Sequence, residues 1–207
     1  MKFEASHDFS SHREHLKSIR EVWLNHPLRD DDIDEALSRV VVLLQPSIIF
    51  GLNITEYPFY SLGIPDSEEQ VDPELVAALT HELTRLIDRH DRHFTVGLLS
   101  EEIDTAIKHL PVRRFASVRR SLRCFWNTYI DGRLERRGMA VHSLNDRFEE
   151  KIGTTRLLTG RYEGHEVAAL SKVRHSEPHT FVELSLLAWI FPYYRAPEYR
   201  NPTEPTT

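Results

Sequence analysis

The sequence predicts a mainly helical α+β protein of 207 residues, and three observations support this fold class. Glycine is scarce, at 8 residues, which favours helices because glycine weakens them. Apolar residues recur at the helical spacing of three and four positions along much of the chain. Short apolar or β-prone stretches interrupt this spacing, so some strands are expected as well. The hydrophobic share of 40% and the charged share of 28% indicate a folded, soluble domain.

Residues 1–54 predict an acidic helical region. A first helix should end near Asn25, where a proline follows two positions later. A second helix should begin in the acidic run 30–35, because carboxylates stabilise a helix N-terminus, and should continue to Pro46. The apolar stretch SIIFGLNI at 47–54 is compatible with either a strand or a helix.

Residues 55–71 predict a loop or linker, since they hold two prolines, a glycine and several turn-formers. Asp72 followed by Pro73 is typical of a helix start, and the apolar stripe that follows predicts a helix to about Arg89. The stretch HFTVG at 93–97 favours a short strand.

Two further helices are expected before Gly132, one from about Ser100 to His109 and one from Pro111 to Asp131. An Asp–Gly pair then predicts a helix stop.

The rest of the chain predicts a small C-terminal α+β region at 143–195. Residues 154–175 resemble a hairpin that turns at Glu163–Gly164. The nearly apolar run at 181–191 must be buried, as a helix or as a strand. Residues 196–207 predict a flexible tail.

Basic side chains are concentrated in residues 108–137, although the whole chain has a net charge of −6. Residues 1–107 carry 9 basic and 21 acidic side chains, whereas 108–137 carry 9 basic and 2 acidic ones. Such an island predicts a face that binds a polyanion, a face that docks on the acidic part of the chain, or a solvated helix surface. Arginine predominates, and its planar fork suits phosphates and base edges. The candidate nucleic-acid-binding residues are Arg113, Arg114, Arg119, Arg120, Arg123, Arg133, Arg136 and Arg137.

The element order within residues 72–142 carries a resemblance. VGLLSEEIDTAI and ASVRRSLRCF are similar to the second helix and the recognition helix of winged helix-turn-helix domains, and GRLERRG at 132–138 is similar to their entry into the wing. The resemblance implies a winged-helix-like domain over these residues. Its third helix would enter the DNA major groove, and a β-hairpin wing would flank that helix. The side chains of this helix left free to contact DNA would be Arg113, Arg119, Arg120 and Arg123.

From these observations we expect a cytoplasmic, non-catalytic protein that binds duplex DNA without a cofactor, in regulation or defence. No run of eighteen apolar residues predicts a membrane span, and the start of the chain lacks the apolar segment of a secretory signal. Cys124 is the single cysteine, which excludes an internal disulfide framework. The alternative is a protein-interaction subunit of a larger complex, which would use the basic face or the apolar C-terminal run as its interface.

A third hypothesis comes from the spacing of Arg137 and His142, which is similar to the Arg–x4–His motif of HEPN-type ribonucleases. The resemblance implies that the histidine acts in acid–base chemistry near the RNA 2′-hydroxyl and that the arginine steadies the phosphate.

Histidine clusters raise the question of a metal site. The dipeptide His90–Asp91 resembles the HD-type metal phosphohydrolases, and His81 and His93 lie close to it in the sequence. A similar N-terminal group consists of His7, His12 and His15. Surface histidine is the preferred interpretation of both groups, and metal binding by the first group stays open.

Overall fold

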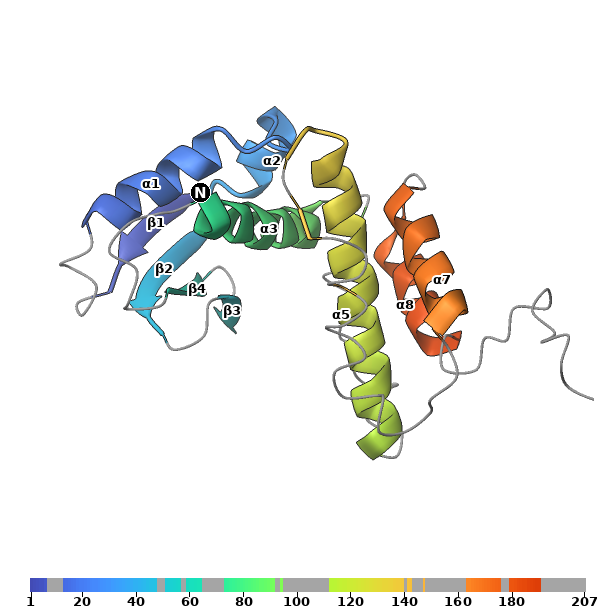
Figure 1. Cartoon of the computed structure of the whole chain (residues 1–207). Coiled ribbons are helices and arrows are strands. Elements are labelled where there is room, and N and C mark those ends of the chain that lie inside the picture. Colours follow the sequence, from blue (N-terminus) through green and yellow to red (C-terminus); the bar gives the residue numbers. More distant parts are fainter. Residues whose placement is uncertain are drawn as a thin grey trace, which may run out of the picture. The chain divides into compact units, whose positions relative to one another are not determined.

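The computed structural model describes part of the chain, in two compact units. The described residues are 1–6, 13–47, 51–56, 59–64, 73–91, 94, 112–139, 141–142, 147, 163–175 and 179–190. The first unit comprises residues 1–97 and 134–141, and the second comprises 98–133 and 142–207. A four-stranded sheet and three helices make up the described part of the first unit, and helices dominate the second (Figure 1).

The sheet of the first unit has the strand order β1-β2-β4-β3. Strands β1, β2 and β4 are parallel, and β3 runs antiparallel to β4. The strand bounds are β1 Lys2–Ala5, β2 Val41–Pro46, β3 Gly51–Glu56 and β4 Phe59–Ile64.

Helices make the long connection that a parallel strand pair needs. Helices α1 (Arg13–Leu24) and α2 (Asp31–Ala36) join β1 to β2. The acidic run starts α2 because the Asp30 carboxylate caps it, accepting a 2.8 Å hydrogen bond from the backbone N–H of Ile33.

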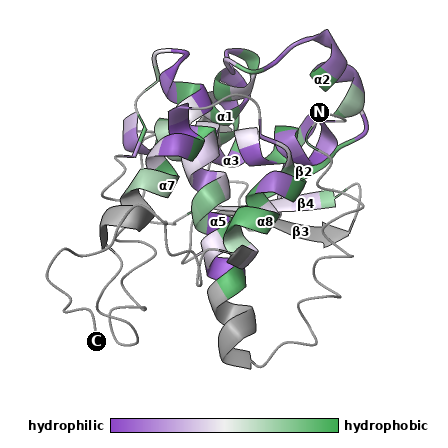
Figure 2. Cartoon of the chain, turned by 90° about the vertical axis from the view of Figure 1, so that its right-hand side faces the viewer, coloured by the Kyte–Doolittle hydropathy of each residue, from purple (hydrophilic) through white to green (hydrophobic). Residues whose placement is uncertain are grey.

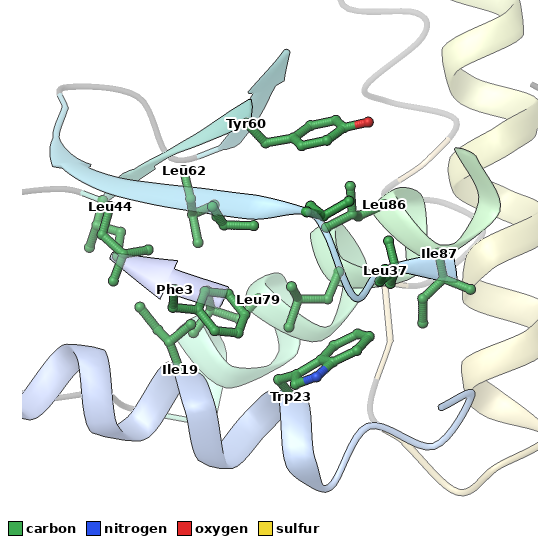
Figure 3. Packing of buried hydrophobic residues seen from close by; sticks show 14 of the residues in the cluster. Phe3, Ile19, Trp23, Leu37, Leu44, Tyr60, Leu62, Leu79, Leu86 and Ile87 are labelled. Atoms are coloured by element: carbon green, nitrogen blue, oxygen red, sulfur yellow. The ribbon is translucent and has the colours of Figure 1, made fainter. Parts of the chain in front are cut away.

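The core of the first unit lies between one face of the sheet and helices α1 and α3 (Pro73–His90), as Figure 3 shows. Alternate residues of β2 and β4, such as Leu44 and Leu62, point into it and are buried. Ile19 of α1 and Leu79 of α3 are fully buried in the same cluster.

The described helices of the second unit are α5 (Val112–Glu135), α7 (Glu163–His175) and α8 (Phe181–Ile190). The ring of Trp126 meets Phe181 edge to face at 5.4 Å, and Tyr129 meets His179 in the same way at 5.7 Å. As the residue number falls along α5 it rises along α8, so these two helices pack antiparallel. Gly132 lies against the backbone of Arg174 at the end of α7.

The prediction of a winged helix is wrong. The sheet lies at the N-terminus, in residues 2–64, and the described structure forms an α/β arrangement. Helix α5 continues through Gly132 to Glu135, where the wing entry was expected. Gly132 lies inside the helix and does not stop it. The absence of a side chain at this position lets α5 approach α7 closely.

Several other expectations also need correction. The predicted helix does not continue through 37–46, because the valines there belong to β2, which pairs with β1 and β4 in the sheet. Strand β4 lies inside the predicted linker 55–71. The predicted hairpin turn at Glu163–Gly164 is instead the start of α7.

The helix expectations succeeded where an apolar stripe and a clear boundary coincide. Helix α1 ends one residue before Asn25, and α3 spans the range expected after Asp72. The apolar C-terminal run, for which helix and strand were both open, forms the helix α8. The predicted helix at 100–109 and the tail at 196–207 lie outside the described residues. None of the helices in the described ranges is both long enough and apolar enough to span a membrane.

Candidate nucleic-acid interface

Two of the predicted arginines share an exposed side of α5. Arg119 and Arg123 are exposed and stand one turn apart, which is an axial rise of about 6 Å. The neighbouring Val118 and Phe125 are buried, so this stretch of α5 has a packed side and a charged side. Arg120 is half-buried.

The other candidate arginines are placed differently. Arg113 and Arg114 lie in the first turn of α5, and their side chains are outside the described residues. The Arg133 guanidinium lies over the ring of Tyr129, 5.3 Å from its centroid, and makes a cation–π contact. Arg136 and Arg137 are exposed in the turn after α5, and Arg137 donates a hydrogen bond to the carbonyl of Pro27.

A buried ion pair anchors the C-terminal half of α5. Asp131 is fully buried and accepts hydrogen bonds of 2.6 and 3.0 Å from the Arg147 guanidinium. Burial raises the pKa of Asp131, and the positive charge of Arg147 opposes that rise. The thiol of Cys124 donates a 3.4 Å hydrogen bond to the carbonyl of Arg147, so the lone cysteine packs inside the unit.

Sequence reasoning missed this pair, because Asp131 was taken as a helix stop. Its partner lies 16 residues further along the chain, and no local pattern connects the two. In the sequence, the carboxyl group of Asp131 stands between Ile130 and a glycine. In the structure, this part of the helix, residues 124–132, is buried throughout.

The histidines of the predicted metal group do not converge. His81 is buried, and His90 follows nine positions later, about two and a half helical turns, so the two residues project from opposite sides of α3. His90 Nε2 lies 2.9 Å from the hydroxyl of Tyr60, and burial lowers its pKa, with Arg89 adding to the effect. In the ranges that the structure describes, no cluster of three His, Cys, Asp or Glu side chains could hold a metal ion. The side chains of His7, His12, His15 and His93 lie outside those ranges.

The HEPN-like pair does not occupy the start of a helix. Arg137 lies in a turn, with its guanidinium on the Pro27 carbonyl, and His142 lies outside regular structure. The carbonyl of His142 accepts a 2.8 Å hydrogen bond from Arg174, while its side chain is exposed. This arrangement gives the ribonuclease hypothesis no support.

Comparisons with known proteins give no relative on which to base a function. No family model matches the chain, and neither a curated protein nor a solved structure is significantly similar to it. The exposed arginines of α5 are therefore the feature that suggests a function.

Proposed function

We propose that the protein binds nucleic acid, without catalysis, through the arginine face of α5, defined as Arg119 and Arg123. The observation that carries this proposal is the exposure of both side chains on one side of a helix whose other residues nearby are packed. No groove-reading helix with a wing is involved, since the fold has another architecture.

The chemistry of this face suits phosphate groups. Each guanidinium presents donors in a fixed fork that can bind two phosphate oxygens at once. Phosphate contacts release counterions, so the affinity should depend steeply on salt. With two to four contacts we expect affinity to fall about 10- to 150-fold between 50 and 200 mM salt.

The net negative charge of the chain does not prevent such binding. At physiological salt the Debye length is about 8 Å, so distant acidic side chains are largely screened from a phosphate bound at α5. The local excess of arginine then sets the potential that the ligand experiences. Because the arginines act locally on phosphate groups, we expect contacts to the sugar–phosphate backbone of the nucleic acid rather than to a particular base sequence.

The test compares two double charge reversals by fluorescence anisotropy with a labelled random-sequence oligonucleotide, in single- and double-stranded form. Arg119→Glu/Arg123→Glu should weaken binding at least about tenfold at 50 mM salt and flatten the salt dependence. Lys17→Glu/Arg39→Glu is the matched control, because it makes the same charge change at two exposed positions of the first unit. Circular dichroism checks that all variants are folded.

Two outcomes would contradict the proposal. Equal losses in both variants would mean that net charge alone drives binding. No binding by the wild-type protein at low salt would leave the alternative, in which the basic face docks on an acidic protein. Stable co-purification of a partner that the Arg119→Glu/Arg123→Glu variant loses would then support that alternative.

A further inference from the structure

Helix α8 exposes part of three apolar side chains. Val182 is 36% exposed, Leu186 is 55% exposed and Trp189 is 36% exposed. Their spacing of four and three positions places them along one side of the helix. Figure 2 shows that most of α8 carries the hydrophobic colour.

The register of α8 against α5 brings Trp189 level with the arginine face. Phe181 packs on Trp126, and the helices are antiparallel. Trp189 lies eight residues beyond Phe181, about 12 Å along α8, and Arg119 lies seven residues before Trp126, about 10 Å along α5. The two residues therefore stand at nearly the same height on neighbouring helices.

Helical rotation places them on the same side as well. Each residue of a helix is rotated by about 100° from the one before it. Counted in the direction of rising residue number, which we take as positive, Arg119 and Arg123 lie about 50° and 90° from the side of α5 that faces α8. On α8, Trp189 lies about 90° from the buried side, also in the positive sense. When an antiparallel pair is viewed from one end, rising residue number turns clockwise around one helix and counter-clockwise around the other. Rotations of the same sign therefore place these three residues on one flank of the helix pair.

The opposite flank is already covered. Gly132 lies about 90° from the α8-facing side in the negative sense, and it contacts the Arg174 backbone of α7. Arg119, Arg123 and Trp189 lie on the flank away from this contact with α7, and all three side chains are exposed. Two cations and an aromatic ring share this surface.

From this juxtaposition we propose that the second unit binds single-stranded nucleic acid, with one unpaired base stacked on Trp189 and the adjoining phosphates held by Arg119 and Arg123. This inference rests on the proposed function and names its substrate class. Single-strand binding proteins combine a positively charged track with exposed aromatic rings, because an unpaired base offers its π-face and a paired base does not. The complementary charges of guanidinium and phosphate favour this ligand over an apolar protein partner.

A lipid surface fits the same residues less well. A membrane-binding helix needs a broad apolar face with cations at its margins. The exposed side of α8 carries the Glu183 carboxylate in its first turn, where an anionic bilayer would repel it. A test with anionic vesicles distinguishes the two ligands.

The experiment measures the affinity of four proteins for a labelled twenty-nucleotide oligo(dT), for a duplex of random sequence and for phosphatidylserine-containing vesicles. The proteins are the wild type, Trp189→Leu, Trp189→Phe and Leu186→Ala. We expect Trp189→Leu to weaken oligo(dT) binding about 5- to 150-fold, the range for loss of one stacked base, and to leave duplex binding unchanged. Trp189→Phe keeps a ring and should recover most of the affinity. Leu186→Ala removes apolar area without a ring and should bind as the wild type does.

A second readout uses the indole itself. Trp23 and Trp126 are buried, so quenching of tryptophan fluorescence by unlabelled oligo(dT) should come mainly from Trp189 and should disappear in Trp189→Leu. Thermal unfolding checks that Trp189→Leu remains folded at the temperature of the binding measurements.

The outcomes separate this inference from the proposed function. Undiminished oligo(dT) binding by Trp189→Leu, with a loss in Arg119→Glu/Arg123→Glu, would overturn the stacking inference and leave nucleic-acid binding in place. Loss of vesicle binding without loss of oligo(dT) binding would assign the surface to lipid. Absence of binding to either nucleic acid by the wild-type protein would overturn both.

Discussion

The carboxylate of Asp131 accepts hydrogen bonds of 2.6 and 3.0 Å from the guanidinium of Arg147, and both side chains are buried. The pair joins the C-terminal half of α5 to a residue in the segment between α5 and α7. Two buried charges at this distance satisfy one another, and either charge alone would be costly.

Removing one partner should therefore destabilise the second unit strongly. We expect Asp131→Ala and Arg147→Ala each to lower the free energy of unfolding by about 3–5 kcal/mol, because each leaves an uncompensated buried charge. The double variant Asp131→Leu/Arg147→Met should recover most of that loss, since it replaces the pair with apolar groups of similar volume. Urea denaturation followed by circular dichroism gives the four values of the cycle, and additive losses would contradict a coupled pair.

Gly132 should be intolerant of a side chain, although alanine normally favours a helix by about 1 kcal/mol over glycine. A Cβ at this position would lie 2.1 Å from the Arg174 carbonyl oxygen. We expect Gly132→Ala to destabilise the protein by about 1–3 kcal/mol through overpacking. Thermal unfolding measures the effect, and a gain in stability would show that α5 and α7 separate easily.

The other described glycine with a special role serves as the comparison. Gly138 has a φ of 77° and open space around its Cα. Gly138→Ala should cost about 1–2 kcal/mol from the left-handed backbone alone. Its penalty comes from backbone conformation alone, whereas the penalty at Gly132 comes from a contact with the Arg174 backbone, which a substitution at Arg174 would not remove.

The His90–Tyr60 contact predicts a pH dependence of stability in the first unit. Burial, followed by the neighbouring Arg89, lowers the pKa of His90 from its ordinary value of 6.5. The unfolded chain then binds a proton more readily than the folded one, so stability is fully present above about pH 6.5 and is lost as the pH falls through the lowered folded pKa. Denaturation midpoints between pH 7.5 and 5 should show this slope.

Two variants assign that slope. His90→Gln should flatten it, because no titrating group remains at the position. Tyr60→Phe should cost about 1 kcal/mol for the lost 2.9 Å hydrogen bond and should keep the slope. An unchanged slope in His90→Gln would place its origin in another group.

Local signals in the sequence were enough for some elements of this fold. Proline and acidic residues after Asp72, with a stripe of leucines, predicted α3 almost to its ends. The caps and charges that begin a helix act within one turn, so they can be seen in a single sequence. The same reasoning located the start of α2 in its acidic run.

The sheet and the site could not be predicted in this way, because both depend on distant parts of the chain. The valines of β2 continue an apolar pattern that suits a helix, and only pairing with β1 and β4, far away in the sequence, makes them a strand. Glu163–Gly164 has the composition of a turn, yet it begins α7. The arginine-rich segment was visible from composition alone, whereas the inference that Trp189 lies near Arg119 depends on the packing of Trp126 on Phe181 and of Tyr129 on His179.

The reversed strand β3 also bears on how quickly the chain can fold. Strand β3 ends at Glu56 and β4 begins at Phe59, so this antiparallel pair closes over two residues and can form within about 1–10 μs. Strand β1 must find β2 across the whole length of α1 and α2, and such distant pairings form more slowly. We therefore expect the β3–β4 hairpin to be present early, with β2 added beside β4 and the N-terminal strand last. During synthesis on the ribosome, the first strand to emerge would then be the last strand to find its place.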